Sequence, residues 1–438
     1  MLASLSVGPF YNGDTSLEFD AVLGVLNYGL PLMKNYGFPL ANGGYLMDQP
    51  PLGFYIQALF FKVFGVSINN GVFLVTLFGL GCVAIVYGIG VVAYNRITGF
   101  FAALLFAFTP WHLFMSRSFL IDTPCLFFSL LSLFLGLIAI LKASLKIFIA
   151  SGIALAAALN TKLYAVFMLV PLLAFFFHYH PKNLKRAATW LTAFSIPVLV
   201  ALFLWYQVIT GIGLSSIFLH NDFTIKNPNI AAPTPFFATN FLVSYGLGWF
   251  FIDALIISVF VGLCLKCTSR EFLFLDATCL ATVICILGVN TFLGAALALK
   301  VPFYNAIKFD YQALPFFSFL AASLISKCLF LFKLSRLKRK AKKVLLVAVA
   351  LLGLALVISA VLYNMEKARW FSTWDYLVFK VDPNINEGYY FFNPNQIGGS
   401  SLSVLYLGFA IGLSGVAWTS RHILNLFLTK FRKRFSNG

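Results

Sequence analysis

Side chains that could do chemistry stand at the ends of the apolar segments of this sequence. Asp14, Asp48 and Asp122 supply carboxylates, and Arg117 and Lys162 supply cations. A carboxylate can accept the proton of a reacting hydroxyl as a general base. An ammonium or guanidinium at a helix end can hold an anionic lipid head group. The pattern therefore predicts a catalytic or binding face where these ends come together.

The apolar segments between these residues must lie in a lipid bilayer. Hydrophobic residues make up 61% of the 438 positions, only 10% are charged, and the mean hydropathy is +0.90. A water-soluble fold could not bury so large an apolar share. Because about 20 apolar residues cross a bilayer as a helix, we predict an all-α polytopic membrane protein with about 11 transmembrane helices. The predicted spans are 71–94, 99–115, 123–141, 145–160, 163–178, 187–211, 241–265, 272–299, 311–332, 344–363 and 402–418.

The net charge of +17 comes from short basic runs between the apolar segments. Runs of this kind indicate topology and argue against a nucleic-acid partner. The strongest are at 178–186, 333–343 and 430–434, and the positive-inside rule places all three in the cytoplasm. Most of the 14 acids then lie in outward-facing loops. We therefore expect a multi-pass protein of the cell membrane whose active face is extracytoplasmic.

The first outward segment is too polar to span the membrane. Its stretch Leu17 to Leu26 suits a helix on the membrane surface, and Leu52 to Phe64 is a second apolar helix too short to cross. The opening residues MLASLSVGPFY resemble the end of a hydrophobic segment, which leaves two alternatives: a further helix before Asp14, or an extracytoplasmic N-terminus. The predicted regions are a first extracytoplasmic loop with juxtamembrane helices at 1–70, a transmembrane core at 71–332, and C-terminal helices at 333–438 that include an extracytoplasmic loop at 364–401.

Five motifs in a fixed order resemble a known family. Asp14 is followed by DQPPLGFYI, SFLIDTPCLFF, ALNTKLYAVFMLVP and KFDYQALP. This order resembles the lipid-linked-sugar glycosyltransferases of the C superfamily, of the protein mannosyltransferase type, with the bacterial aminoarabinose transferase of lipid A as a relative in pattern. The resemblance covers roughly the first 330 residues. It implies transfer of a monosaccharide from a polyprenyl-phosphate donor to a protein, lipid or glycan acceptor, with inversion at the anomeric carbon.

The same resemblance implies roles for the charged residues at the helix ends. Asp14 matches the acid favoured as catalytic base, and Asp122 matches the second outward acid. Lys162 and Lys308 match the cations that would bind the donor phosphate, and Arg117 is a further candidate for this role. The structural alternatives are that Asp14 and Asp122 cap helices and that the two lysines extend to the membrane surface.

Four further residues are expected to line the donor or acceptor pocket: Glu18, Asp48, Gln49 and Tyr311. Gln49 departs from the family, which commonly has Lys before the proline, so this turn is a weaker phosphate site. Glu18 and Asp20 have an alternative interpretation as solvated residues on the polar face of a surface helix.

A divalent metal is a further hypothesis, with Asp48 and His220 as its candidate ligands. The seven cysteines are interpreted as apolar filler, because Cys264 and Cys267 are the only close pair and no second pair stands at metal-site spacing.

Two other functions fit parts of the pattern. A transporter or flippase of lipid-linked sugars would place ionisable residues near the bilayer midplane, whereas the centres of these spans are nearly free of charge. A membrane scaffold without catalytic activity is the second alternative, because Gln49 breaks a family motif.

Overall fold

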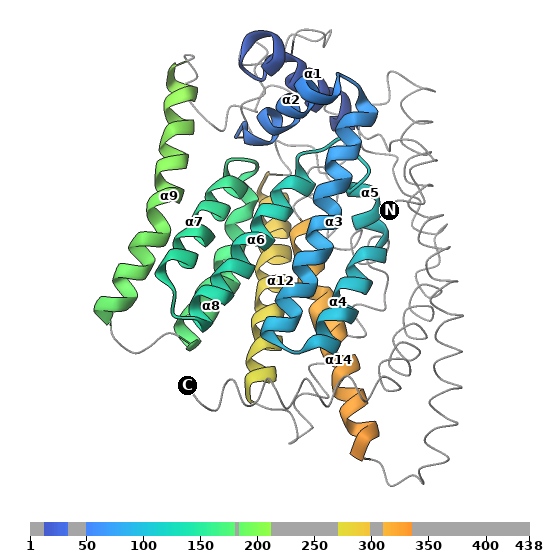
Figure 1. Ribbon diagram of the computed structural model, residues 1–438, viewed down its shortest axis with the longest axis vertical. Coiled ribbons are helices and arrows are strands. Elements are labelled where there is room, and N and C mark those ends of the chain that lie inside the picture. Colours follow the sequence, from blue (N-terminus) through green and yellow to red (C-terminus); the bar gives the residue numbers. More distant parts are fainter. Residues whose placement is uncertain (1–12, 34–49, 180–183, 212–269, 298–309, 335–438) are drawn as a thin grey trace.

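The computed structural model describes residues 13–33, 50–179, 184–211, 270–297 and 310–334. Most of these residues lie in helices joined by short turns (Figure 1). The elements in chain order are α1 (Gly13–Tyr28), α2 (Leu52–Phe64), α3 (Ile68–Ala93), α4 (Arg96–Phe108), α5 (Pro110–Met115), α6 (Asp122–Leu141), α7 (Leu145–Leu159), the 3-10 helix η3 (Leu163–Met168), α8 (Leu169–Tyr179), α9 (Leu184–Gly211), α12 (Arg270–Leu297), the 3-10 helix η6 (Asp310–Ala313) and α14 (Leu314–Leu334).

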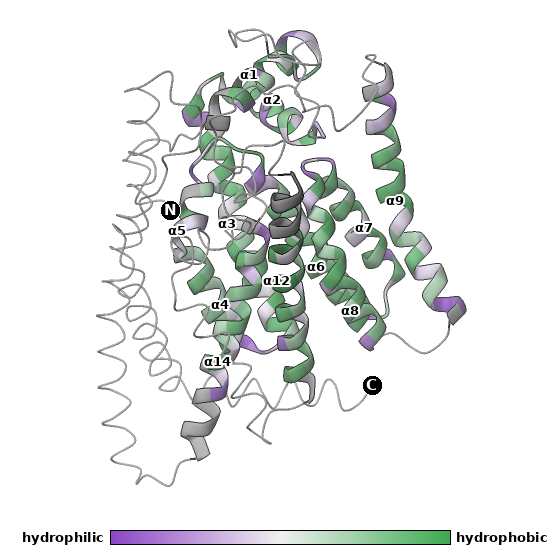
Figure 2. Ribbon diagram, turned by 180° about the vertical axis from the view of Figure 1, so that it is seen from behind, coloured by the Kyte–Doolittle hydropathy of each residue, from purple (hydrophilic) through white to green (hydrophobic). Residues whose placement is uncertain are grey.

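The long helices stand side by side as a bundle, and α1 and α2 lie across one end of it (Figure 1). Among the described residues, four helices are long and apolar enough to cross a membrane: Ile68–Ala93, Asp122–Leu141, Lys185–Val208 and Phe272–Val289. Hydrophobic residues run along the bundle (Figure 2), and apolar side chains such as Leu199 and Phe203 of α9 are exposed. The predicted fold class, an all-α polytopic membrane protein, is confirmed.

Most predicted spans that fall within the described residues coincide with helices to within a few residues. The span 99–115 is divided, because α4 ends at Phe108 and α5 begins at Pro110. Thr109 between them is extended, with φ −62° and ψ 127°, since the proline ring disfavours helical backbone in the residue before it. Three further predicted spans, at 241–265, 344–363 and 402–418, lie outside the described residues, so the count of about 11 stays a prediction.

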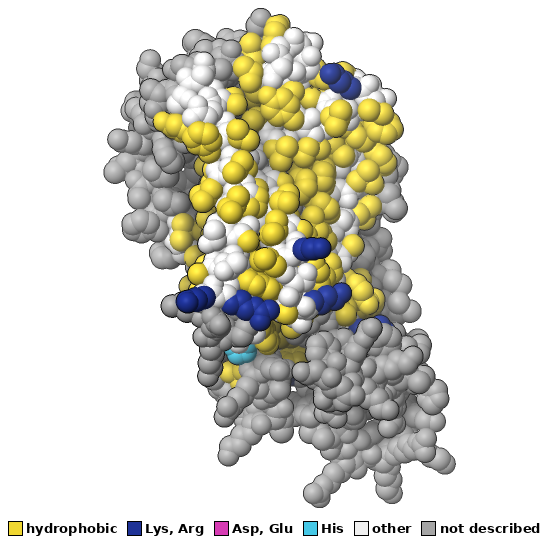
Figure 3. Space-filling view, turned by 60° about the vertical axis from the view of Figure 1, so that its left-hand side comes forward, with side chains coloured by type: hydrophobic (Ala, Val, Ile, Leu, Met, Phe, Trp, Pro, Cys, Tyr) yellow, Lys and Arg dark blue, Asp and Glu magenta, His cyan; other side chains and the backbone are white. Residues whose placement is uncertain are grey.

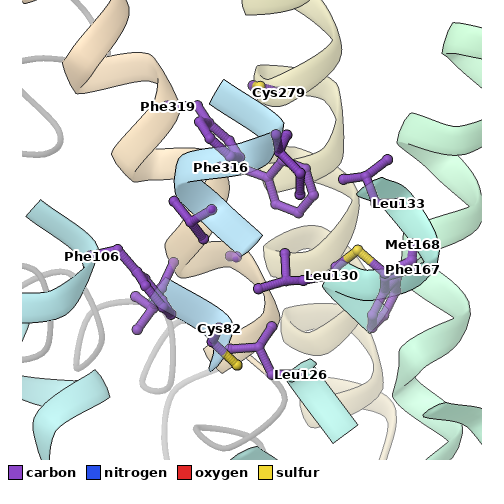
Figure 4. Close-up of a cluster of buried hydrophobic side chains, with 14 of the residues drawn as sticks. Cys82, Phe106, Leu126, Leu130, Leu133, Phe167, Met168, Cys279, Phe316 and Phe319 are labelled. Atoms are coloured by element: carbon purple, nitrogen blue, oxygen red, sulfur yellow. The ribbon is translucent and has the colours of Figure 1, made fainter. Parts of the chain in front are cut away.

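Glycines let neighbouring helices approach closely. A side chain at Gly90 of α3 would bring its Cβ within 2.4 Å of the Cα of Gly99 in α4, and one at Gly152 of α7 would come equally close to the Phe194 carbonyl oxygen of α9. Small residues at helix contacts are common in membrane bundles, where van der Waals packing drives association. The core between the helices is filled by apolar side chains from α3, α4, α6, α12 and α14, including Phe106, Leu130 and Phe316 (Figure 4).

The layer formed by α1 and α2 is anchored on the bundle by apolar contacts. Ala21 and Val22 of α1 are fully buried in one cluster with Phe54 of α2 and with Phe119 and Ile121, which precede α6. Gly65, with φ +88°, ends α2 in a left-handed conformation that glycine adopts without strain. The α1–α2 layer therefore rests on the turn that leads into α6.

A buried ion pair holds the opposite end of the bundle. Asp276 of α12 accepts hydrogen bonds from Lys327 Nζ at 2.5 Å and Ser323 Oγ at 3.1 Å, both on α14. Its other carboxylate oxygen accepts a bond of 3.0 Å from the Tyr94 hydroxyl, just after α3. The sequence pattern does not reveal this cluster, because each of its two charges stands alone in an apolar segment.

Removal of one hydroxyl from this cluster should weaken the bundle moderately. We expect Tyr94→Phe to lower the free energy of unfolding by about 1–2 kcal/mol, because a buried carboxylate oxygen loses its donor. Tyr87→Phe is the matched control, since Tyr87 is exposed on α3, seven residues before Tyr94. Denaturant titration in detergent measures both variants, and equal stabilities would contradict the described bond.

Candidate active site

Asp122 and Lys162 form a buried ion pair at the end of the bundle covered by α1 and α2. Asp122 is the first residue of α6, and Lys162 follows the end of α7. Because α6 and α7 are antiparallel neighbours joined by a short turn, the start of one helix lies beside the end of the other. Lys162 Nζ donates to Asp122 Oδ2 at 2.6 Å, and the Tyr164 hydroxyl donates to Oδ1 at 2.7 Å. Both oxygens of this carboxylate are thus engaged by the turn after α7.

Glu18 brings α1 into the same cluster. One carboxylate oxygen lies 3.7 Å from Lys162 Nζ, and the other accepts a hydrogen bond of 2.8 Å from the backbone N–H of Ile121. This carboxylate therefore joins the α1 layer to the start of α6 and to the lysine. We call the three charged residues Glu18, Asp122 and Lys162 the charge cluster.

All members of the charge cluster are withdrawn from solvent. Their exposed fractions are 5% for Glu18, 0% for Asp122 and 2% for Lys162. Burial by itself lowers the pKa of the Lys162 ammonium, but the charges of Asp122 and then Glu18, with the hydrogen bond to Asp122, outweigh it and raise that pKa. Lys162 therefore remains a cation.

This geometry overturns three of the structural alternatives. Lys162 is not a lysine that extends to the membrane surface, because it is buried and paired. Glu18 and Asp20 are not solvated, because both are buried where α1 packs on the bundle. Asp122 is not the cap of α6: the N-cap position is Ile121, and the carboxylate binds side chains after α7.

Tyr311 belongs to a second polar contact near the start of α14. Its hydroxyl lies 2.6 Å from His112 Nδ1 of α5, and both side chains are fully buried. His112 is also 3.4 Å from the Ser116 hydroxyl in the turn before α6, where Arg117 is buried as well. Tyr311 therefore packs on the segment that leads into Asp122.

The remaining predicted residues are described in part or lie outside the described residues. Asp14 lies in the first turn of α1, one helical turn before Glu18, so the two positions share a face of that helix. Asp48, Gln49, Lys308 and His220 lie outside the described residues. Within the described ranges, three or more His, Cys, Asp or Glu side chains are nowhere grouped in a way that could hold a metal ion.

The chain is similar to known proteins in part of its sequence and in its fold. Residues 48–206 match the model of the family described as dolichyl-phosphate-mannose-protein mannosyltransferase. No curated protein sequence matches the chain significantly. Among solved structures, ArnT from Cupriavidus metallidurans in the apo state aligns with a TM-score of 0.56 at 15% identity, over 94% of this chain and 75% of ArnT.

Two further solved structures share the fold. ArnT bound to undecaprenyl phosphate gives a TM-score of 0.53 at 14% identity, over 94% of this chain and 74% of ArnT. The oligosaccharyltransferase of Archaeoglobus fulgidus gives 0.53 at 12% identity, over 92% of this chain and 60% of that enzyme. The chain has the fold of ArnT and of this oligosaccharyltransferase, and its residues 48–206 match the mannosyltransferase family model. The resemblance expected from the motifs is confirmed in the fold and in this family match.

The family match and the candidate site of this glycosyltransferase-like chain overlap only in part. Residues 48–206 include Asp122, Arg117 and Lys162, whereas Asp14 and Tyr311 lie outside the matched segment. Tyr164 is absent from the predicted site, although it stands two residues after Lys162, in η3. His112 is also absent from the predicted site. It lies beside Tyr311 because the fold brings α5 next to a residue 199 positions away in the chain.

Proposed function

We propose that the chain transfers a monosaccharide from a polyprenyl-phosphate donor to a hydroxyl of a protein, lipid or glycan on the extracytoplasmic face of the membrane. Asp14 is the proposed base that takes the acceptor proton, with Asp122 as the second acid of the site. Lys162, Lys308 and Arg117 are the proposed ligands of the donor phosphate. Attack of the acceptor oxygen on the anomeric carbon, with departure of polyprenyl phosphate from the opposite face, inverts the configuration.

The observation that carries this proposal is the charge cluster at one end of a membrane bundle. A transferase of this kind needs a cation to stabilise the departing phosphate and a carboxylate to accept a proton, both near the lipid interface. Lys162 supplies such a cation beside Asp122, the second acid of the site, and both residues lie inside the segment that matches the mannosyltransferase family. ArnT and the archaeal oligosaccharyltransferase have been solved with undecaprenyl phosphate and dolichol-phosphate respectively, which supports a lipid phosphate as the carrier.

The distribution of basic residues supports the proposed orientation. The helix ends at which Arg96, Lys142 and Lys185 stand lie at the end of the bundle opposite the charge cluster. On the face shown in Figure 3, Lys and Arg gather mainly toward that end of a broad apolar surface. Because cytoplasmic loops are enriched in Lys and Arg, the charge cluster belongs on the outer side. The regions 1–70, 71–332 and 333–438 and the metal hypothesis at Asp48 and His220 stay predictions.

A reconstitution assay tests the reaction against the flippase alternative. Purified protein in vesicles receives dolichyl-phosphate mannose labelled in the sugar, with a membrane extract as acceptor. We expect label to move to an acceptor while dolichyl phosphate is released. Movement of intact labelled lipid between leaflets, with the sugar–phosphate bond preserved, would support the flippase and contradict the transferase.

A further inference from the structure

A buried carboxamide on α2 has no hydrogen-bond partner among the described residues. The Gln57 side chain is fully buried, and neither its Oε1 nor its Nε2 is bonded to any part of the chain that the structure describes. An unsatisfied buried amide costs about 1–3 kcal/mol, and folded proteins rarely keep one without a use. Because both amide atoms lack partners, the conclusion is the same for either orientation of the amide.

Gln57 lies on the face of α2 that packs against the turns bearing the charge cluster. Gly53 is one helical turn earlier on that face, and a Cβ added there would lie 2.7 Å from Ile121 and 3.0 Å from Thr161. Ile121 and Thr161 immediately precede Asp122 and Lys162 in the sequence. The carboxamide therefore lies in the layer that covers the charge cluster.

A second buried carboxamide reaches the same region from η6. Gln312 is fully buried, its Nε2 lies 3.5 Å from Cys125 Sγ, and its Oε1 lacks a partner among the described residues. Cys125 follows Asp122 by one turn of α6, and its thiol lies 3.7 Å from the Lys162 carbonyl oxygen. Two separate elements thus bring an unsatisfied amide oxygen to the surroundings of one ion pair.

The hydrogen-bonding groups of the two carboxamides indicate which part of the lipid-linked donor they would bind. An ionised phosphate offers only acceptors, so it could satisfy an amide N–H but not an amide oxygen. A sugar hydroxyl both donates and accepts, and it is neutral like the carboxamide. We propose that Gln57 and Gln312 bind hydroxyl groups of the sugar carried by the lipid donor. This inference rests on the proposed function and assigns sugar recognition to residues distinct from the phosphate-binding cations.

Binding of the lipid with and without its sugar separates this role from a structural one. The variants are Gln57→Leu and Gln312→Leu, with Gln207→Leu as matched control because Gln207 is an exposed glutamine on α9. Affinities for dolichyl phosphate and for its mannose and glucose derivatives are measured in detergent, together with thermal unfolding. Loss of one or two neutral hydrogen bonds should weaken binding of the sugar-bearing lipid by about tenfold.

The expected pattern is specific to a sugar contact. Both variants should bind bare dolichyl phosphate like the wild type and unfold at the same or a higher temperature, because an unsatisfied buried amide has been removed. Equal weakening for all three lipids, or lower stability with unchanged affinities, would overturn the inference and leave the proposed function standing. A wild-type protein that binds none of the lipids would overturn the proposed function itself.

Discussion

Lys162→Met should lower the free energy of unfolding by about 3–5 kcal/mol. The substitution leaves Asp122 and Glu18 buried without the ammonium that lies 2.6 Å and 3.7 Å from them. Loss of one partner is far more costly than loss of the whole pair, because the desolvated charge that remains is no longer compensated. Denaturant titration of the protein in detergent, followed by tryptophan fluorescence, measures the change.

The controls distinguish the loss of an ion pair from the loss of any lysine. Lys146→Met, at an exposed position in the first turn of α7, should change stability by less than about 0.5 kcal/mol. The triple variant Lys162→Met, Asp122→Leu and Glu18→Gln removes all three charges and should recover much of the lost stability, yet transfer no sugar. A Lys162→Met protein as stable as Lys146→Met would contradict the burial of the charge cluster.

Asp14→Asn should lower the rate of sugar transfer by about 100- to 10,000-fold, the contribution that general acid–base groups commonly make. An amide keeps the size of the side chain but cannot accept the acceptor proton. The measurement is single-turnover transfer from labelled dolichyl-phosphate mannose, with donor affinity determined in parallel. Affinity should stay near that of the wild type, because the donor phosphate is assigned to Lys162, Lys308 and Arg117.

Glu18→Gln is the informative comparison, one turn further along α1. Its amide oxygen can still accept the backbone N–H of Ile121, but its negative charge beside Lys162 is lost. We expect a clear loss of stability with a smaller loss of rate than in Asp14→Asn. Unchanged transfer by a folded Asp14→Asn protein would remove Asp14 from the mechanism.

The membrane architecture could be predicted because bilayer thickness fixes the length of a spanning helix. The predicted span 71–94 is α3, and 123–141 is α6, each with bounds that shift by no more than a few residues. Pro110 is the residue that divides the span 99–115, a break that apolar length alone does not predict. Apolar length thus predicts where a helix runs better than it predicts where the helix breaks.

Pairings within the site were harder to predict, because they depend on which helices are neighbours. Lys162 and Asp122 are 40 residues apart, and only the antiparallel packing of α6 on α7 brings them within 2.6 Å. The solvated alternative for Glu18 assumed a helix on the membrane surface, whereas α1 packs on the bundle and buries this side chain. Local pattern shows that a residue is polar, and tertiary packing decides what it touches.

Lys162 is shared between two anions before any substrate is present. When all three groups are ionised, two carboxylates and one ammonium give the charge cluster a net charge of −1. A lipid phosphate that reaches Lys162 adds a third anion beside this one ammonium. It must therefore compete with Asp122 and Glu18, which already bind the ammonium. Donor binding should therefore resemble ion exchange more than simple capture, and its affinity should depend on how much additional positive charge reaches the same end of the bundle.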